Sequence, residues 1–600
     1  MALAGTMLAM FCLLSLILVG VLAGTQGGGG LLTLTGNGDQ AASRQMQSTA
    51  AFNIADSGIE YTLQWLHFRT PQSGPPSLNH AFPLPAWGGS PGDPAGVYTL
   101  GGGTFTVWIF PDALNNAAAN TTGQGAVKKY LIQSTGTCNG LTQTVQAYVS
   151  QTSFGNYAIF LDNTPPNAYW GSGLNVFDGP VHSNNSDGVA NNILWSDGTG
   201  GTPAAPIFTY QGSDAFTVSG PSVNWYRNTY GNSSPPTSET EWKMIATAGS
   251  SGIHTGVPTI PLPAVDPTQQ YAAMGQPPPP PGSTAPPSGL PTTIGVLVPS
   301  SGGQTSGGMY IHGPVQQMTL SVDPHNSTTQ IIQIQQTDDN GNPYLTTLTL
   351  TASTAQPTTL VHVDYFQQSG QSGNFYPAST DTLYNGVTNG VVYCDSNIGK
   401  TVPNNQNGQA GNDPTAQPLT NPRSGGVTGV IADGSALTIA TDTSRGPTIG
   451  NINIDGSLTY STPRQTDGSG NLLPESDVNN AAFRANAGLL GIVAQNVQVV
   501  DNDTSGNPIK NIEVDAAVMA FGTYDAADYT KRPAGKMLNM GSYIVKTRGL
   551  FSTGGLGYVA SGIPCSRLYD NRLASRPPPF FPTTSSQYRV LSWQRVAVPL

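Results

Sequence analysis

The sequence predicts a mainly β protein with two helices near its N-terminal end. Only 9% of the 600 residues are charged, and Gly (73) and Pro (49) together make up about a fifth of the chain. This composition disfavours helices and favours strands and turns. After Gly386, short apolar runs alternate with turn residues. We therefore expect a long β-solenoid of the right-handed β-helix type over most of the chain, with β-sandwich domains as the alternative.

Changes in pattern divide the chain into four predicted regions. They are a transmembrane anchor at 1–24, a helix and β-hairpin head at 25–150, a solenoid-like region at 151–575 and a Pro- and aromatic-rich tail at 576–600. A Pro-rich stretch at 258–291 cannot join a sheet ladder, so we expect it to form an excursion from the solenoid.

The first region is apolar enough to cross a membrane as one helix. No charged side chain occurs from Met1 to Ala23, and such a helix spans roughly 33 Å at ~1.5 Å per residue. A cleaved signal peptide is the alternative, since Leu22-Ala23-Gly24 offers small residues for cleavage, but no basic residue precedes the run. We expect a single-pass membrane protein whose remaining chain is extracytoplasmic or at the cell surface. The apolar side chains of this anchor are Met7, Leu8, Phe11, Leu13, Leu14, Leu16, Ile17, Leu18 and Val19.

A second helix is expected to begin near Asp39, a suitable N-cap, after the Gly-rich stretch Gly27–Gly30. Its apolar residues recur at helical intervals and define one amphipathic face, and Pro71 ends the pattern. This face consists of Met46, Ala50, Ile54, Tyr61, Trp65 and Phe68.

Alternating strands are expected after this helix. The first is Gly103–Ile109, and the next two, Tyr130–Thr137 and Thr142–Val149, flank the dipeptide Asn139-Gly140. Asn-Gly between alternating runs is typical of a two-residue hairpin loop. Further strands are expected at Gly390–Tyr393, Gly429–Ala432, Ala436–Ile439, Asn451–Ile454, Gly491–Ala494, Val497–Val500, Ile512–Asp515 and Ser542–Val545.

The second helix carries a motif, Ala55-Asp56-Ser57-Gly58-Ile59-Glu60, within the segment Ala51–Glu60. This motif and the strands after it resemble the N-terminal region of PilX-type minor pilins of type IV pilus systems, over about the first 150 residues. The remaining chain is similar to an uncharacterised bacterial β-rich ectodomain. Two features depart from the pilin pattern: no basic leader precedes the apolar run, and Gly27–Gly30 interrupts what would be one continuous helix.

The resemblance implies a membrane-anchored surface protein, a minor component or accessory of a type IV pilus-like filament (a fimbrium) that acts in assembly or adhesion. Its implied partners are the membrane and other pilin-like subunits, with surface glycans as further candidates. Two other functions stay open. One is a tethered envelope structural protein without a filament, which would not require the Ala55–Glu60 motif. The other is a carbohydrate-binding or carbohydrate-active β-helix protein, which as an enzyme would require clustered carboxylates.

The sequence contains no motif that indicates an enzyme and no basic run that indicates a nucleic-acid-binding protein. No HExxH, GxSxG, Walker or dinucleotide motif occurs in a supporting context, so we expect no enzyme and no cofactor. The net charge is −11 and no Lys/Arg run exceeds a pair, so we expect no nucleic-acid partner. Aromatic residues between Trp195 and Tyr226 fit either a packed core or a sugar-stacking face.

Candidate metal ligands are few. Asp501–Asn507 has oxygen-bearing residues at positions 1, 3 and 5 of a calcium loop, but Ile512 occupies position 12, so we expect a turn. His182 and His312 each adjoin a Gly-Pro-Val and are interpreted as turn residues, so no metal site is expected. Outside the apolar run, the cysteines are expected to be buried thiols rather than a disulfide framework; they are Cys138, Cys394 and Cys565.

Overall fold

The computed structural model describes residues 30–68, 97–111 and 129–596, apart from short internal segments. Those segments are 167, 172–175, 200–204, 230–231, 264–266, 278–284, 353–356, 366–378, 400–424, 445, 447, 469–471, 501–508, 533–534 and 556–557. The predicted anchor at 1–24 and the calcium-like loop Asp501–Asn507 lie outside the described residues.

A small head consists of one long helix on a five-stranded antiparallel sheet of order β1-β2-β3-β4-β32. Its elements are α2 (Gly30–Phe68), β1 (Val97–Leu100), β2 (Gly103–Pro111), β3 (Lys129–Cys138), β4 (Leu141–Ser153) and β32 (Thr583–Val596). Asn139 and Gly140 both have positive φ (48° and 80°), the conformation that a type I′ hairpin loop requires. The predicted hairpin between β3 and β4 is therefore confirmed.

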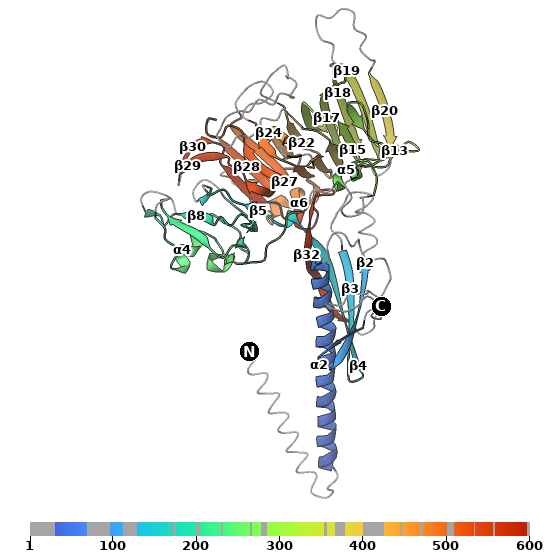
Figure 1. The fold of residues 1–600 in the computed structure, drawn as a ribbon, viewed down its shortest axis with the longest axis vertical. Helices are drawn as coiled ribbons and strands as arrows, with labels where there is room; N and C mark the ends of the chain where they lie inside the picture. The colour runs from blue at the N-terminus through green and yellow to red at the C-terminus, as the bar shows by residue number, and fades with distance from the viewer. Residues whose placement is uncertain are drawn as a thin grey trace, which may run out of the picture.

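A large β body is inserted between β4 and β32. Thr583 at the start of β32 pairs with Ser153 at the end of β4, so the chain leaves the head and returns to it at one place. Figure 1 shows β32 running from the body down along the head. Head and body have separate hydrophobic cores among the described residues. Most of the predicted tail at 576–600 is therefore a strand of the head sheet.

Most body strands join into one continuous mixed sheet that contains two parallel ladders. The first ladder has the order β11-β9-β7-β5-β28-β27-β25-β23-β21-β15. Its members are β5 (Ile159–Asn163), β7 (Val181–Ser183), β9 (Phe216–Val218), β11 (Ile253–Thr255), β15 (Met309–His312), β21 (Val391–Cys394), β23 (Ala436–Thr441), β25 (Leu489–Ala494), β27 (Asn511–Ala526) and β28 (Lys536–Arg548). The second ladder runs from β16 (Gln317–Asp323) through β22 (Val427–Ile431) and β24 (Ile452–Tyr460) to β26 (Val497–Val499).

An antiparallel meander extends the second ladder beyond β16. Its strands are β17 (Asn326–Thr337), β18 (Pro343–Thr351), β19 (Thr358–Tyr365) and β20 (Thr380–Asn385). Buried and half-buried residues alternate along β17 and β18, as expected for strands with one face on a core.

Shorter elements complete the body. Its other strands are β6 (Tyr169–Gly171), β8 (Asn191–Trp195), β10 (Val223–Arg227), β12 (Gly295–Leu297), β13 (Ser300–Ser301), β14 (Gln304–Thr305), β29 (Ser552–Gly555), β30 (Tyr558–Gly562) and β31 (Cys565–Tyr569). Its described helices are α4 (Glu239–Lys243), α5 (Thr268–Ala273) and α6 (Ala481–Asn486), with 3₁₀ turns at Phe154–Asn156, Gly249–Gly252, Val478–Asn480 and Asn571–Ala574.

The solenoid prediction is wrong. A solenoid stacks each repeat on the repeat before it in the chain. Here the chain enters in the middle of the first ladder at β5 and builds outwards to β11. It then resumes at the opposite end with β15 and returns to β28, which pairs with β5. Thus no sheet among the described residues closes into a solenoid, and the mainly parallel ladders also differ from the antiparallel sheets of a β-sandwich.

The structure tests membrane-spanning character only in the described helices, which do not include the predicted anchor at 1–24. Among the described residues, none of the helices combines the length and the apolar character that crossing a membrane requires. The long helix α2 carries polar residues throughout, including Asp39, Arg44 and Glu60. It also begins at Gly30, so Asp39 lies inside the helix rather than at its N-cap.

Candidate assembly site

The predicted motif lies where α2 packs on the head sheet. Ala55, Gly58 and Ile59 are buried, Asp56 and Ser57 are half-buried, and Glu60 is exposed. The buried face also includes Ala51 and Ile54, which pack with Val107, Ile132, Val145 and other side chains of β2, β3 and β4. The predicted helix face is therefore only partly correct, because Met46 is 68% exposed and lies outside this core.

Small residues let the helix backbone approach β3 closely. A Cβ added at Gly136 would overlap the carbonyl oxygen of Ala51 and the backbone nitrogen of Ala55. One added at Gly58 would overlap the side chain of Ser134. The small residues of the helix motif and the Ser134-Thr135-Gly136 segment of β3 are thus two halves of one packing contact.

The edge strand β32 contacts this helix from the same face of the sheet. The indole Nε1 of Trp593 donates a hydrogen bond to Oδ1 of Asp56 at 3.0 Å, and the ring meets Phe52 edge-on at 5.6 Å between centroids. Arg595 lies over the same Phe52 ring and donates to Gln143 of β4. Asp56, the polar residue in the motif, therefore joins the helix to the last strand of the sheet.

A chain of glutamines crosses the opposite face of the head sheet. Gln594 of β32 donates to Gln146 of β4 at 3.2 Å, and Gln146 donates to Gln133 of β3 at 2.9 Å. Neither this chain nor the Trp593 contact was predicted. The signal was hidden because β32 lies far from β4 in the sequence.

The exposed side of α2 carries an uncharged stripe. Met46 lies on it, and at 3.6 residues per turn it is opposite to the buried face, whereas Ala50 lies at its edge and packs against the head core. The residues along this stripe line a shallow hollow; they are Ala42, Gln45, Met46, Thr49, Ala50 and Asn53. Figure 1 shows the N-terminal half of α2 extending beyond the sheet that packs on its other half.

Comparisons with known proteins find matches among solved structures only. No protein-family model matches the chain, and no curated protein matches it. Three chains of solved structure match, among them the competence-associated pilin ComZ from Thermus thermophilus. That chain is 16% identical, with 92% of this chain and 97% of that chain covered, at a TM-score of 0.26.

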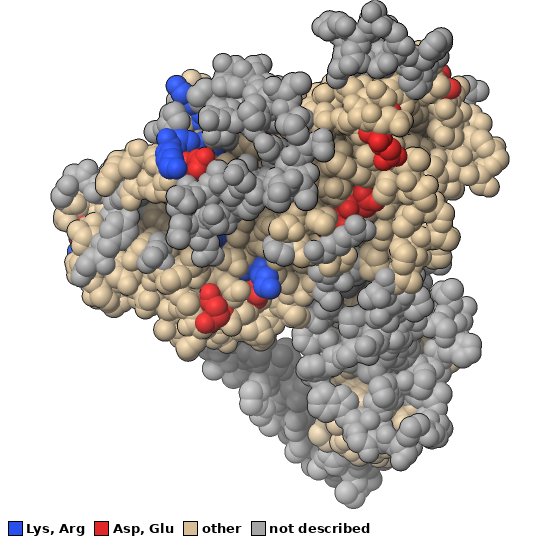
Figure 2. All heavy atoms as spheres, turned by 45° about the horizontal axis from the view of Figure 1, so that its top comes forward, with Lys and Arg blue, Asp and Glu red and all other residues tan. Residues whose placement is uncertain are grey.

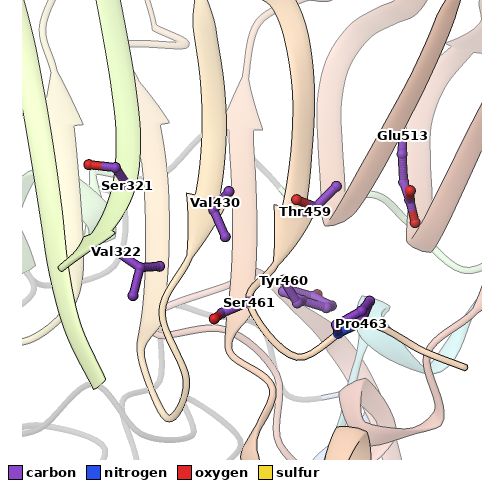
Figure 3. A pocket seen from close by; sticks show the side chains of 8 residues that line it. All are labelled: Ser321, Val322, Val430, Thr459, Tyr460, Ser461, Pro463 and Glu513. Atoms are coloured by element: carbon purple, nitrogen blue, oxygen red, sulfur yellow. The ribbon is translucent and has the colours of Figure 1, made fainter. Parts of the chain in front are cut away.

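A groove of about 560 Å³ crosses strand ends on the body (Figure 3). Its lining comes from β16, β22, β24 and β27 and from the loop after β24: Ser321, Val322, Val430, Thr459, Tyr460, Ser461, Pro463 and Glu513. Asp515, two residues along β27 from Glu513, has a fully buried carboxyl that accepts the N–H of Tyr460 at 3.1 Å. Burial, and then the neighbouring Glu513, raise the pKa of Asp515 well above its ordinary range, and burial raises the pKa of Glu513.

The remaining predicted residues have structural surroundings. His182 is a buried strand residue that hydrogen-bonds Thr217 and Asn184, and His312 bonds Asp395 at 2.6 Å, so neither is a turn residue. Among the residues that the structure describes, no group of three His, Cys, Asp or Glu side chains is placed to hold a metal ion. The three predicted free thiols are confirmed as buried; they are Cys138, Cys394 and Cys565.

The aromatic cluster of the body is core. Trp195, Phe208 and Phe216 are fully buried, and Trp225 packs against the same core. The three fully buried rings therefore offer no open face for sugar stacking. Figure 2 shows the body surface from another side, with only scattered charged side chains on a largely uncharged face.

Proposed function

We propose that this chain is a pilin-like subunit, a minor component of a surface filament that carries the large β body outwards. The supporting observation is the division of α2: one half packs on the small head sheet through the motif, and the other half extends beyond it. Its partners are then other pilin-like subunits, and its body lies outside the cytoplasm.

The exposed stripe of α2 supports helix-to-helix contact between subunits. It holds no charged residue, and Ala42, Met46 and Thr49 follow the four-and-three spacing that keeps one helix facing another. Small residues at such a contact allow helices to approach closely, as they do for Gly136 and Ala51 within the head.

The test is recovery of the full chain from filaments sheared off the surface of the source cells. We expect the wild-type chain in the filament fraction and at least a tenfold loss there for Met46→Lys, because a charge would be buried between helices. Val478→Lys is the matched control, since Val478 is an exposed apolar residue of the body (79%).

Absence of the wild-type chain from filaments would contradict the proposal and favour an envelope protein without a filament. Equal recovery of Met46→Lys and Val478→Lys would show that the stripe does not face another subunit. Circular dichroism of both variants checks that the fold is retained.

A further inference from the structure

A continuous row of polar side chains crosses eight neighbouring strands of the body. All its members are exposed or half-buried on one face, and together we call them the polar strip. In order across β20, β19, β18, β17, β16, β22, β24 and β27 they are Asp381, His362, Thr347, Gln333, Thr319, Thr428, Ser457 and Glu513.

Strand register makes the polar strip continuous. Across the meander, His362 is paired with both Asp381 and Thr347, and Gln333 is paired with both Thr347 and Thr319. Seven steps between strands give the strip a length of about 34 Å.

The strip continues over the parallel ladder. Thr319 is paired with Thr428, whose hydroxyl donates to the carbonyl of Ser457. The Ser457 hydroxyl in turn accepts the backbone N–H of Glu513 at 3.1 Å. At Glu513 the strip reaches the groove of Figure 3.

An apolar row lies alongside the strip on the same face. Leu383 is paired with Leu360, and Thr349 connects Leu360 to Ile331. Leu383 is 64% exposed. Val430, in the groove lining, extends the apolar character towards Glu513. The face thus offers hydroxyl, amide and carboxyl groups, with aliphatic side chains beside them at Leu383, Leu360, Ile331 and Val430.

The charges on this face favour a neutral ligand. No Lys or Arg belongs to the polar strip or to the groove lining, so neither offers a cation to phosphate or to acidic sugars. A hydrogen bond between His362 and Asp381 (2.6 Å) lies at one end of the strip, and Glu513 lies at the other. Hydroxyl and amide side chains match the hydrogen-bonding groups of sugar rings, while the apolar row matches their C–H faces.

We propose that the polar strip and its groove form a binding site for a linear, neutral polysaccharide lying across the strands. The inference rests on the proposed function in one respect only, that the body is the part presented outwards. Binding of the polymer is a property of the body and does not require a filament.

The test is retention of the purified full chain on insoluble neutral polymers, namely cellulose, chitin and starch, with an acidic alginate gel for comparison. Gln333→Ala combined with Thr347→Ala removes a facing pair in the middle of the strip. We expect about tenfold weaker retention, since two hydrogen bonds are lost. Thr351→Ala combined with Thr358→Ala is the control, a facing pair at the end of β18, outside the strip.

Retention on at least one neutral polymer that falls for the strip variant and not for the control supports the proposal. No retention on any neutral polymer, equal retention of both variants, or preference for alginate would overturn it. Filament recovery is measured separately, so failure of polymer binding leaves the filament proposal standing.

Discussion

At the scale of single residues, Gly136 sets how closely the helix and sheet of the head approach. We expect Gly136→Ala to destabilise the head by about 3 kcal/mol, because the new Cβ would overlap the helix backbone at Ala51 and Ala55. Thermal unfolding followed by circular dichroism measures the effect. Gly171→Ala is the control, because a Cβ there meets nothing within 4 Å. Equal melting of the two variants would refute the close approach.

Asp515 makes stability depend on pH. Its pKa is raised in the folded chain by burial and by Glu513, whereas the unfolded value is about 3.9. Above about pH 4 the folded state therefore holds a proton that the unfolded state has lost. Stability must then fall as pH rises towards the folded pKa.

We expect Asp515→Asn to make this fall shallower, because an amide does not titrate yet still accepts the N–H of Tyr460. Denaturant unfolding at several pH values measures how steeply the free energy of unfolding falls in each variant. The exposed Asp364 supplies the control, Asp364→Asn, which should keep the wild-type slope. An unchanged slope in Asp515→Asn would rule out this residue as the source.

Residue-level prediction succeeded where the chemistry is local. Asn139-Gly140 predicts its hairpin because both residues tolerate positive φ. The roles of His182 and His312 could not be predicted, because Thr217 and Asp395, which bond them, lie far along the chain. The partner of Asp56 was hidden for the same reason.

At the scale of elements, β32 depends on Trp593 for its hold on the helix. We expect Trp593→Ala to lower the free energy of unfolding of the head by about 2 kcal/mol. This is the sum of an aromatic contact with Phe52 and a hydrogen bond to Asp56. Hydrogen exchange should then speed up in β32 more than in β3.

Trp593→Phe separates the two contributions, since it keeps a ring and removes the N–H donor. Its exchange in β32 should be intermediate between wild type and Trp593→Ala. Exchange in β32 that is unchanged by either substitution would mean that main-chain pairing with β4 alone holds the strand.

The runs expected as strands after Gly386 do form strands, because alternation and turn residues act locally. Their partners could not be predicted from the same signal. Parallel pairing of β28 with β5 joins residues near 544 to residues near 160. No local sequence pattern indicates that these two strands pair. The solenoid prediction failed at this step, since it assumed that neighbours in the chain are neighbours in the sheet.

At the scale of the whole molecule, the body is an insertion in the head. Because Ser153 and Thr583 are paired, a short Gly-Ser linker is long enough to join them in place of residues 154–582. We expect the shortened chain to fold with its own core and to show a cooperative thermal transition. The same chain ending at Ser153 is the control and should melt lower. A shortened chain without cooperative melting would show that the head needs the body.

The insertion also orders events during synthesis. The ribosome completes β4 about 430 residues before β32, so β4 stays an unpaired edge of the nascent head for as long as the body is being made. A chain released early, anywhere within the body, keeps that edge unpaired and lacks the indole that fastens Asp56. A head with β32 paired to β4 therefore shows that translation has passed through the entire body.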